Sequence, residues 1–357
     1  MQILRVSPSY SSQESPGSGL NAYSHTVNSR FESYVLTEYS DKTLFDSPNS
    51  TIKKLQVPKF KLLHNSHFFF FSFLLKAIQI FIFLLKSLPT LYKYRFKIIH
   101  CYTPIHIFTG LLSKIFFKSK LFVSLHGTDL VTLKKIRMQN ILFYIADCVL
   151  LTSNAMYKDF PQKYHHKIRF MGNGFDEKIF FNKALSRRKQ IITVGGLRWQ
   201  KNQELLIRAF YHSNLYEHGF KLTLVGNGKL KDKLHNLVFS LGLTDSVEFI
   251  DELSQHELSV IYNESSLFAL SSVSEGSPKV VIEAMACGLP VVSTNVGDIS
   301  SIVGDLGAIC DSNIECFSKA LTTSVNKTWA GESISKYISY RSWSRITDNL
   351  DNIYLEF

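Results

Sequence analysis

The stretch "SEGSPKVVIEAMACGLPVV", residues 274–292, predicts a short helix packed inside an α/β domain. Ser277 is a favourable N-cap and Pro278 a favourable first helical residue, so we expect the helix to begin there and to run to Cys287. Gly288 suits the position just after the last turn. Because the residues of this helix are small or apolar nearly all round, the helix is predicted to be buried.

Two glutamates in this stretch need an explanation. Glu283 is the one acid inside the predicted helix, and a buried carboxylate needs hydrogen-bond donors because its desolvation is costly. Glu275 lies in the loop just ahead. A rise of ~1.5 Å per residue separates the two acids by at most about 12 Å, close to the span from a ribose to a hexose across a diphosphate. The helix amino terminus between them favours an anion, so the spacing predicts a nucleotide-sugar site with Lys201 as a phosphate ligand.

A simpler alternative uses the same residues. Glu283 then forms an ion pair with Lys201 or Lys279, and Glu275 is a solvated loop acid. In that case neither acid binds a sugar.

Short apolar runs alternate with longer amphipathic segments along the whole chain, which is typical of βα units around parallel sheets. A chain of 357 residues is too long for one ordinary core, so we expect two similar α/β domains. The first covers residues 1–172 and the second 191–335, with the polar segment 173–190 as the linker. The expected strands lie at residues 3–6, 34–36, 98–100, 121–125, 148–152, 168–171, 191–194, 222–225, 247–250, 267–270 and 291–294.

Ligands of open α/β sheets bind beyond the carboxyl ends of the strands, so the loops there are the informative ones. Gly17 and Gly19 follow the first strand and can bring backbone N–H groups close to an anion. His126 follows the strand at 121–125. "GGLRWQKN", residues 195–202, carries Lys201 ahead of an amphipathic helix. These loops are further candidates for the site.

Positive charge is concentrated in the first half of the chain. Residues 1–180 contain 23 lysines and arginines against 10 acids, and no acid occurs between Asp46 and Asp129. We therefore expect an anionic partner. No helix-turn-helix, zinc finger or RNP-like stretch is present, so a membrane surface or an anionic glycolipid is favoured over nucleic acid.

The segment "HFFFFSFLLKAIQIFIFLLKSLPTLYKYRF", residues 67–96, supports a membrane partner. Its apolar part approaches the length of a transmembrane helix, but Lys76 and Gln79 lie near its middle, where charge in hydrocarbon is costly. We expect a helix in the bilayer interface. A core helix and a transmembrane span are the alternatives.

The compartment and the cofactors are predicted from what the sequence lacks. The five cysteines form no CxxC pair, so neither a zinc site nor a disulfide framework is indicated, and a reducing cytoplasm is expected. No signal peptide is recognised at the amino terminus. The chain has no D-x-D motif, so we expect no metal and no cofactor.

Several segments, in order along the chain, resemble glycosyltransferase family 4, the large group 1 of retaining transferases with the GT-B fold. The stretch "SEGSPKVVIEAMACGLPVV", with the residues after it, is similar to the E-x7-E region of that family. The other matching segments are "MQILRVSPSY" with "GSGLNAYSHTV", "LHGTDL", "ADCVLLTS", "MGNGFDEKIF", "VGGLRWQKNQELLIRAF", "LTLVGNGKLKDKL", "SVEFIDELSQHEL" and "YRSWSRITDNLDNIY".

The resemblance implies two Rossmann-like domains facing each other across a cleft, with a terminal helix at 336–357 that returns to the first domain. It implies that Glu283 binds the ribose, Glu275 the transferred sugar and Lys201 the phosphate. The other residues implied at the site are Gly196 in the phosphate loop, Ile250 beside the base, Gly276, Ser277, Pro278 and Val280 along the sugar and diphosphate, Gly19 opposite the diphosphate, and His126 by the sugar. The family often has an arginine where this chain has Gly196, which places more weight on Lys201.

The activity implied is transfer of a sugar, with retained configuration, from a nucleotide-diphosphate sugar to a hydroxyl group. We expect a glycan or lipid-linked acceptor, in bacterial surface polysaccharide synthesis such as O-antigen, capsule or lipopolysaccharide. The enzyme is expected at the inner face of the cytoplasmic membrane, held there peripherally. A nucleotide-sugar epimerase of related fold and a non-catalytic membrane-associated subunit are the alternatives.

Overall fold

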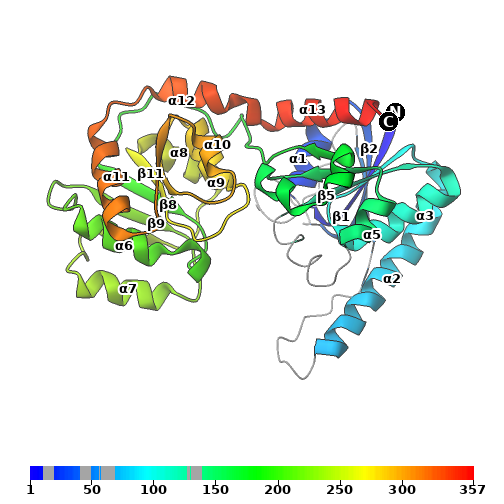
Figure 1. Cartoon of the computed structure of the whole chain (residues 1–357), viewed down its shortest axis with the longest axis horizontal. Helices are drawn as coiled ribbons and strands as arrows, with labels where there is room; N and C mark the ends of the chain where they lie inside the picture. The colour runs from blue at the N-terminus through cyan, green and yellow to red at the C-terminus, as the bar shows by residue number, and fades with distance from the viewer. Residues whose placement is uncertain (11–19, 41–49, 56, 58–68, 127–128, 130–138) are drawn as a thin grey trace. The chain divides into compact units, whose positions relative to one another are not determined.

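The computed structural model describes residues 1–10, 20–40, 50–55, 57, 69–126, 129 and 139–357. By their contacts, these residues form two compact units. Unit 1 consists of residues 1–152, 156–171 and 344–357, and unit 2 of residues 153–155 and 172–343. Each unit is an α/β domain built on a parallel sheet, which confirms the predicted fold class (Figure 1).

Unit 1 has a seven-stranded sheet within its described residues, in the order β3-β2-β1-β4-β5-β6-β7. The strands are β1 Gln2–Tyr10, β2 Glu32–Ser40, β3 Ser50–Lys54, β4 Ile98–Cys101, β5 Lys120–Leu125, β6 Cys148–Leu151 and β7 Ile168–Phe170. The helical elements are α1 Leu20–Asn28, α2 Phe69–Tyr94, η2 Pro104–His106, α3 Ile107–Phe117, α5 Gln139–Ile145, η3 Asn154–Asp159, η4 Gln162–Lys167 and α13 Trp343–Leu355. The central strands are almost wholly buried, as expected for a parallel sheet with helices on both faces.

Unit 2 has a six-stranded sheet in the order β10-β9-β8-β11-β12-β13, again counted over the described residues. Its strands are β8 Gln190–Val194, β9 Lys221–Val225, β10 Val247–Ile250, β11 Leu267–Leu270, β12 Val291–Thr294 and β13 Gly307–Cys310. Its helical elements are η5 Trp199–Lys201, α6 Gln203–His212, α7 Lys231–Ser240, α8 Gln255–Glu264, α9 Lys279–Ala286, α10 Ile299–Val303, α11 Ile314–Asn326, α12 Gly331–Ile338 and η6 Ser339–Arg341. The predicted linker, residues 173–190, clusters with this unit up to the start of β8.

The helix predicted in the opening stretch is α9, and its beginning differs from the prediction. Pro278 occupies the N-cap position with φ −72° and ψ 113°, so it is not the first helical residue and Ser277 is not the cap. The extended ψ of Pro278 delays the first helical turn to Lys279. The end is as predicted, because Gly288 follows the last turn with φ +73°.

The carboxyl-terminal helix α13 packs into unit 1. The Asp351 carboxylate accepts hydrogen bonds from the Ser29 hydroxyl, at 2.9 Å, and from the Arg30 backbone N–H, at 2.9 Å. The Tyr354 hydroxyl lies 2.6 Å from Nδ1 of the buried His100 on β4. The last residues of the chain therefore complete the domain that the first residues begin.

Candidate functional site

The predicted donor residues lie at one edge of the unit 2 sheet. Strand β8 has β9 on one side and β11 on the other, and all three run parallel. Their carboxyl ends therefore meet at the same edge, where the loops 195–202, 226–229 and 271–278 begin.

The loops after β8 and β9 touch through their backbones. Gly226 has φ +140°, and a Cβ atom at that position would lie 2.2 Å from the carbonyl oxygen of Gly195. Such a distance is far below van der Waals contact, so only glycine fits there. This close approach fixes the beginning of the loop that carries Lys201.

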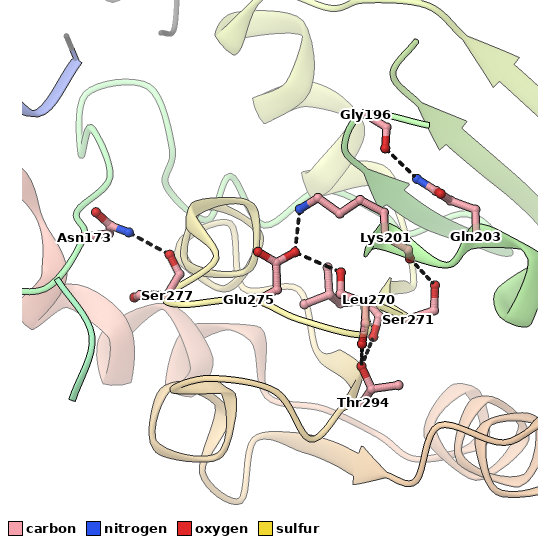
Figure 2. A network of polar contacts seen from close by, with 10 residues as sticks. Asn173, Gly196, Lys201, Gln203, Leu270, Ser271, Glu275, Ser277 and Thr294 are labelled. Carbon is pink, nitrogen blue, oxygen red and sulfur yellow. Dashed lines mark hydrogen bonds and ion pairs between the residues drawn. The ribbon is translucent and has the colours of Figure 1, made fainter. Parts of the chain in front are cut away.

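Lys201 and Glu275 form an ion pair at this edge. The Lys201 Nζ atom lies 2.6 Å from Oε1 of Glu275, and the Ser272 hydroxyl donates a 2.9 Å hydrogen bond to the same oxygen (Figure 2). Both charged side chains are 16% exposed. The pair is thus partly shielded from solvent but not fully buried.

Main-chain contacts hold this cluster in place. Ser271 donates from its hydroxyl to the carbonyl oxygen of Lys201, at 3.0 Å, and the Val273 N–H donates to the Gln200 carbonyl, at 2.8 Å. The Thr294 hydroxyl at the end of β12 donates to the Ser272 carbonyl, at 2.6 Å. Figure 2 shows Ser271 and Thr294 with their contacts close to the ion pair. The loops from three strands therefore set the position of the lysine and of the acid together.

The loop between Glu275 and α9 is held from both sides. The Asn173 side chain donates a 2.7 Å hydrogen bond to the carbonyl oxygen of Ser277 (Figure 2). The Asp298 N–H donates to the Gly276 carbonyl, at 2.9 Å. With its carbonyl groups engaged in this way, the loop leads into the amino end of α9, whose first N–H groups have no partner within the helix.

Glu283 lies on α9, buried as predicted, with 9% of its surface exposed. Burial raises the pKa of its carboxyl to about 7, and the positive charge of Lys279, one turn earlier, offsets only part of that rise. Burial also lowers the pKa of the Lys279 amine to about 8, despite the nearby carboxylate. Near neutral pH these two groups therefore lose or gain a proton easily.

The alternative pairing of these acids is wrong in two respects. Lys201 pairs with Glu275 and not with Glu283. Glu275 is also not a solvated loop acid, because only 16% of its side chain is exposed. The part of the alternative that joins Glu283 to Lys279 agrees with their mutual electrostatic effect. That these acids bind sugar hydroxyls stays a prediction.

Other predicted donor residues lie near the same edge. The Gly196 carbonyl accepts a 3.2 Å hydrogen bond from the Gln203 side chain. A Cβ atom built at Gly196 would lie 3.5 Å from Nε of Arg198, which places that guanidinium beside the loop. Ile250 ends β10, where its carbonyl accepts the Gly226 N–H at 2.8 Å.

Three predicted residues remain. Val280, in the first turn of α9, packs against the apolar core of unit 2. In unit 1, His126 follows β5, and its backbone N–H donates to the Asp129 carboxylate at 2.9 Å. Burial raises the pKa of that carboxyl above its ordinary value. Gly19 lies outside the described residues.

Sequence reasoning missed Asp298. Its carboxylate accepts hydrogen bonds from the backbone N–H groups of Asn154, at 2.9 Å, and Ala155, at 2.8 Å. The same residue binds the Gly276 carbonyl through its own N–H. A signal was available, since an aspartate just before a short helix is a typical capping residue, but its partners are 144 and 143 residues away.

Within the described part of the chain, no group of three or more histidine, cysteine, aspartate or glutamate side chains gathers in a way that suits a metal ion.

Comparison with known protein families finds two adjoining matches. The family described as "Glycosyl transferases group 1" matches residues 175–340, and "Glycosyltransferase Family 4" matches residues 24–178. The boundary between the two matches falls at the junction of unit 1 and unit 2. Together they extend over nearly all of the chain.

Two curated relatives are bacterial transferases. The N-acetyl-alpha-D-glucosaminyl L-malate synthase of Bacillus anthracis is 28% identical over 54% of this chain and 54% of its own length. A Campylobacter jejuni 4-alpha-N-acetylgalactosaminyltransferase, named for an N-acetylgalactosamine-N,N'-diacetylbacillosaminyl-diphospho-undecaprenol, is 31% identical over 44% of this chain and 43% of its own length. The chain spans less than two thirds of the curated relatives it matches.

One solved structure shows how far the fold agrees. The structure of Anabaena HepE in complex with UDP aligns with this chain over 100% of both chains. The TM-score is 0.76 and the sequence identity is 18%.

Proposed function

This chain belongs to the family 4, group 1 glycosyltransferases of the GT-B fold, and from that premise we propose that it transfers a sugar from a nucleotide-diphosphate sugar to a hydroxyl group of a glycan or lipid-linked acceptor. The observation that supports this most is the cluster of Lys201, Glu275 and Ser272 just ahead of α9. This cluster holds a cation and a carboxylate beside a helix amino terminus at one sheet edge.

The donor diphosphate binds between Lys201 and the first N–H groups of α9 in this proposal. Both favour negative charge, and neither needs a metal ion to do so. Glu275 holds the ammonium of Lys201 in place until the phosphate arrives. Lys201 then shares its three N–H donors between the acid and the phosphate oxygens.

Glu275 and Glu283 take the two sugars of the donor. Glu275 accepts hydroxyl groups of the transferred sugar, at the open edge of the sheet. Glu283 accepts the ribose hydroxyl groups from within α9, where their hydrogen bonds stabilise its charged form. Ile250 borders the base, and Gly196, Gly276, Ser277, Pro278 and Val280 line the rest of the donor.

Departure of the nucleoside diphosphate is the step that these charges accelerate. Negative charge grows on the leaving phosphate as the bond to the sugar breaks, and Lys201 and α9 stabilise it. The leaving phosphate takes the proton of the acceptor hydroxyl, which attacks from the same face of the sugar and so retains the configuration. The roles of Gly19 at the diphosphate and of His126 at the sugar stay predictions from the family resemblance.

The acceptor is a growing glycan on a lipid, and the role is bacterial surface polysaccharide synthesis at the inner face of the cytoplasmic membrane. The name of the Campylobacter jejuni relative contains a diphospho-undecaprenol, which supports a lipid-linked acceptor. The acid-free stretch between Asp46 and Asp129 supports an anionic membrane surface as partner.

Thermal-shift measurements against UDP, GDP and ADP sugars test the donor site, because a ligand that binds only the native state raises the melting temperature. We expect one nucleotide class to raise it, and Lys201→Ala to abolish the shift. Lys229→Ala is the matched control, since Lys229 is an exposed lysine of the neighbouring loop 226–229. If no nucleotide shifts the wild-type protein, the proposal fails and the non-catalytic subunit is favoured.

Incubation of the enzyme with the donor that binds then separates transfer from epimerisation. We expect the sugar to leave the nucleotide only when an acceptor is added. Conversion of the donor alone into an isomeric nucleotide sugar would instead identify an epimerase.

A further inference from the structure

Helix α2 of unit 1 is joined to the domain core by one of its faces. Phe83 and Leu91 belong to the buried apolar core, and the Phe83 ring packs against the tilted ring of His106 at 4.2 Å between centroids. Gln79, 4% exposed, donates from Nε2 to the Glu38 carboxylate of β2, at 2.6 Å. These contacts fix the helix to unit 1 from Gln79 to Leu91.

The opposite face of α2 is apolar and exposed. Its side chains recur at alternating intervals of four and three residues, which places them in one stripe along the helix. The stripe consists of Leu74 (45% exposed), Ile78 (40%), Phe81 (58%), Leu85 (48%), Leu88 (38%) and Tyr92 (69%). A run of six large apolar side chains in solvent is unusual for a folded domain and marks a contact surface.

Helix α3 extends this surface. It packs against α2, and the Tyr92 and Phe117 rings meet at 6.3 Å between centroids. Phe108, Ile115 and Phe116 of α3 are 44%, 62% and 70% exposed. We call the stripe on α2 together with these three residues the α2–α3 apolar face.

Exposed basic residues lie beside the α2–α3 apolar face. Twelve basic residues and no acid occur between Asp46 and Asp129. The exposed basic residues on or beside the two helices are Lys86, Lys93, Arg95, Lys97, Lys118 and Lys120. An anionic lipid surface complements both properties, because its headgroups attract the lysines and arginines while its acyl chains take the apolar stripe.

We propose that the α2–α3 apolar face is the membrane-docking surface of this protein, and that α2 lies in the interface of an anionic bilayer with Leu74 to Tyr92 turned to the acyl chains. The inference rests on the membrane partner proposed above and names the residues that meet it. It requires no sugar transfer, so the two are tested separately.

A transmembrane span fits the same helix less well. Residues 74–94 are long and apolar enough to cross a bilayer by length and composition. A span would, however, withdraw Phe83 and Leu91 from the core of unit 1 and expose Gln79 and Ser87 to hydrocarbon, where unpaired polar groups are costly. With one face fixed in the domain, α2 offers lipid only its other face.

A second copy of the chain is also a poorer occupant. Two copies joined through this face would bring together two surfaces that have basic residues and, from residue 47 to 128, no acid. Like charges in contact oppose association. An anionic lipid surface meets no such repulsion.

Vesicle flotation of the full chain, without any nucleotide, tests the proposal. We expect flotation with vesicles of phosphatidylglycerol and phosphatidylcholine, little with phosphatidylcholine alone, and loss of binding in high salt. The double variant F81S/L85S should lower the partition coefficient by about a hundredfold, because each of the two apolar side chains removed from lipid counts for about tenfold. Lys93→Glu with Arg95→Glu should lower binding to the anionic vesicles only.

Matched controls lie in unit 2. Phe239→Ser removes an aromatic side chain that is 79% exposed on α7, and Lys336→Glu reverses an exposed charge on α12. Both should bind vesicles like the wild type. The nucleotide-induced thermal shift, measured on every variant, reports that the fold and the donor site are intact.

Three results would overturn the proposal. Undiminished flotation of F81S/L85S would remove the apolar face from membrane binding. A soluble dimer that F81S/L85S converts to monomer would assign the face to a second copy. Wild-type protein that alkaline carbonate fails to extract from membranes would indicate a span. Absence of any nucleotide shift would count against the donor site and leave the docking surface standing.

Discussion

The Arg5 guanidinium on β1 donates a 3.1 Å hydrogen bond to the hydroxyl of Tyr354 on α13, 349 residues later in the chain. Arg5 is fully buried, and it also donates hydrogen bonds to the hydroxyls of Ser33 and Tyr102. A buried guanidinium depends on such acceptors, because their loss leaves its charge without solvation. The first strand and the last helix are therefore joined by a charge-assisted contact in the interior of unit 1.

The substitution Tyr354→Phe tests this contact. It removes one acceptor from Arg5 and one partner from His100 while leaving the ring in place. We expect the free energy of unfolding of unit 1 to fall by about 1 to 3 kcal/mol. Urea denaturation followed by circular dichroism measures it. Tyr92→Phe, at a side chain 69% exposed on α2, is the control, and an equal loss there would refute the assignment.

Lys201→Ala should be severe in the proposed transfer reaction. It removes the cation that stabilises the leaving diphosphate, and we expect kcat/KM to fall by about 100-fold to 1000-fold. Lys201→Arg restores the charge but not the compact ammonium that fits beside Glu275, so partial activity is expected. Near-normal turnover by Lys201→Ala would exclude this residue from the mechanism.

The pair of Glu283 and Lys279 gives unit 2 a distinctive pH dependence. Burial raises the pKa of Glu283 from 4.5 to about 7. Between these two pH values the carboxyl is therefore protonated in the folded state and ionised in the unfolded state. The free energy of unfolding therefore falls as pH rises from about 4.5 to about 7. The pKa of Lys279 is lowered from 10.5 to about 8, so the free energy of unfolding rises again between about 8 and about 10.5.

The substitution Glu283→Gln should remove the first of these slopes. At pH 7.5 we expect the free energy of unfolding of the variant to exceed that of the wild type by about 1 to 3 kcal/mol. The variant is more stable because it buries no charge at that position. Urea titrations at several pH values measure this. The variant should also lose donor binding, which would distinguish a functional acid from one retained for stability.

Asp298→Ala should loosen the segment at Asn154 and Ala155. Two backbone N–H groups lose their carboxylate acceptor, and we expect the free energy of unfolding to fall by about 1 to 3 kcal/mol. Asp298→Asn should lower the free energy of unfolding by less, because the amide oxygen still accepts one hydrogen bond. Asp305→Asn, at an exposed position nearby, is the control. If Asp298→Ala has the same denaturation curve as the wild type, the two hydrogen bonds contribute nothing to stability.

Much of the fold was predictable from apolar periodicity. All eleven expected strands are present, with ends that differ by a few residues at most except in β1 and β2, which extend further. The sequence did not indicate β3 or β13. Strand β3, "STIKK", is polar and pairs only with β2, and β13 begins with Gly307 and pairs only with β12. Edge strands with so little apolar patterning do not show the alternation of apolar and polar residues that identifies a strand in a sequence.

The sequence predicted part of the geometry of the candidate site but not its ion pair. The opening stretch correctly placed a buried acid in a short helix that ends before Gly288. The partner of Glu275 was missed because Lys201 lies 74 residues earlier, and the two meet only because β8 and β11 are neighbours in the sheet. Sequence periodicity identifies strands, whereas their order in the sheet depends on packing between distant segments.

Because residues 344–357 belong to unit 1, that domain is interrupted in the chain by the whole of unit 2. During synthesis unit 2 emerges complete and can fold at once, whereas unit 1 must wait for residues 344–357 to leave the ribosome. Until then Arg5 and His100 lack the hydroxyl of Tyr354. The domain that is translated first is therefore the one that matures last, and a chain cut short near its end releases an unfinished amino-terminal half.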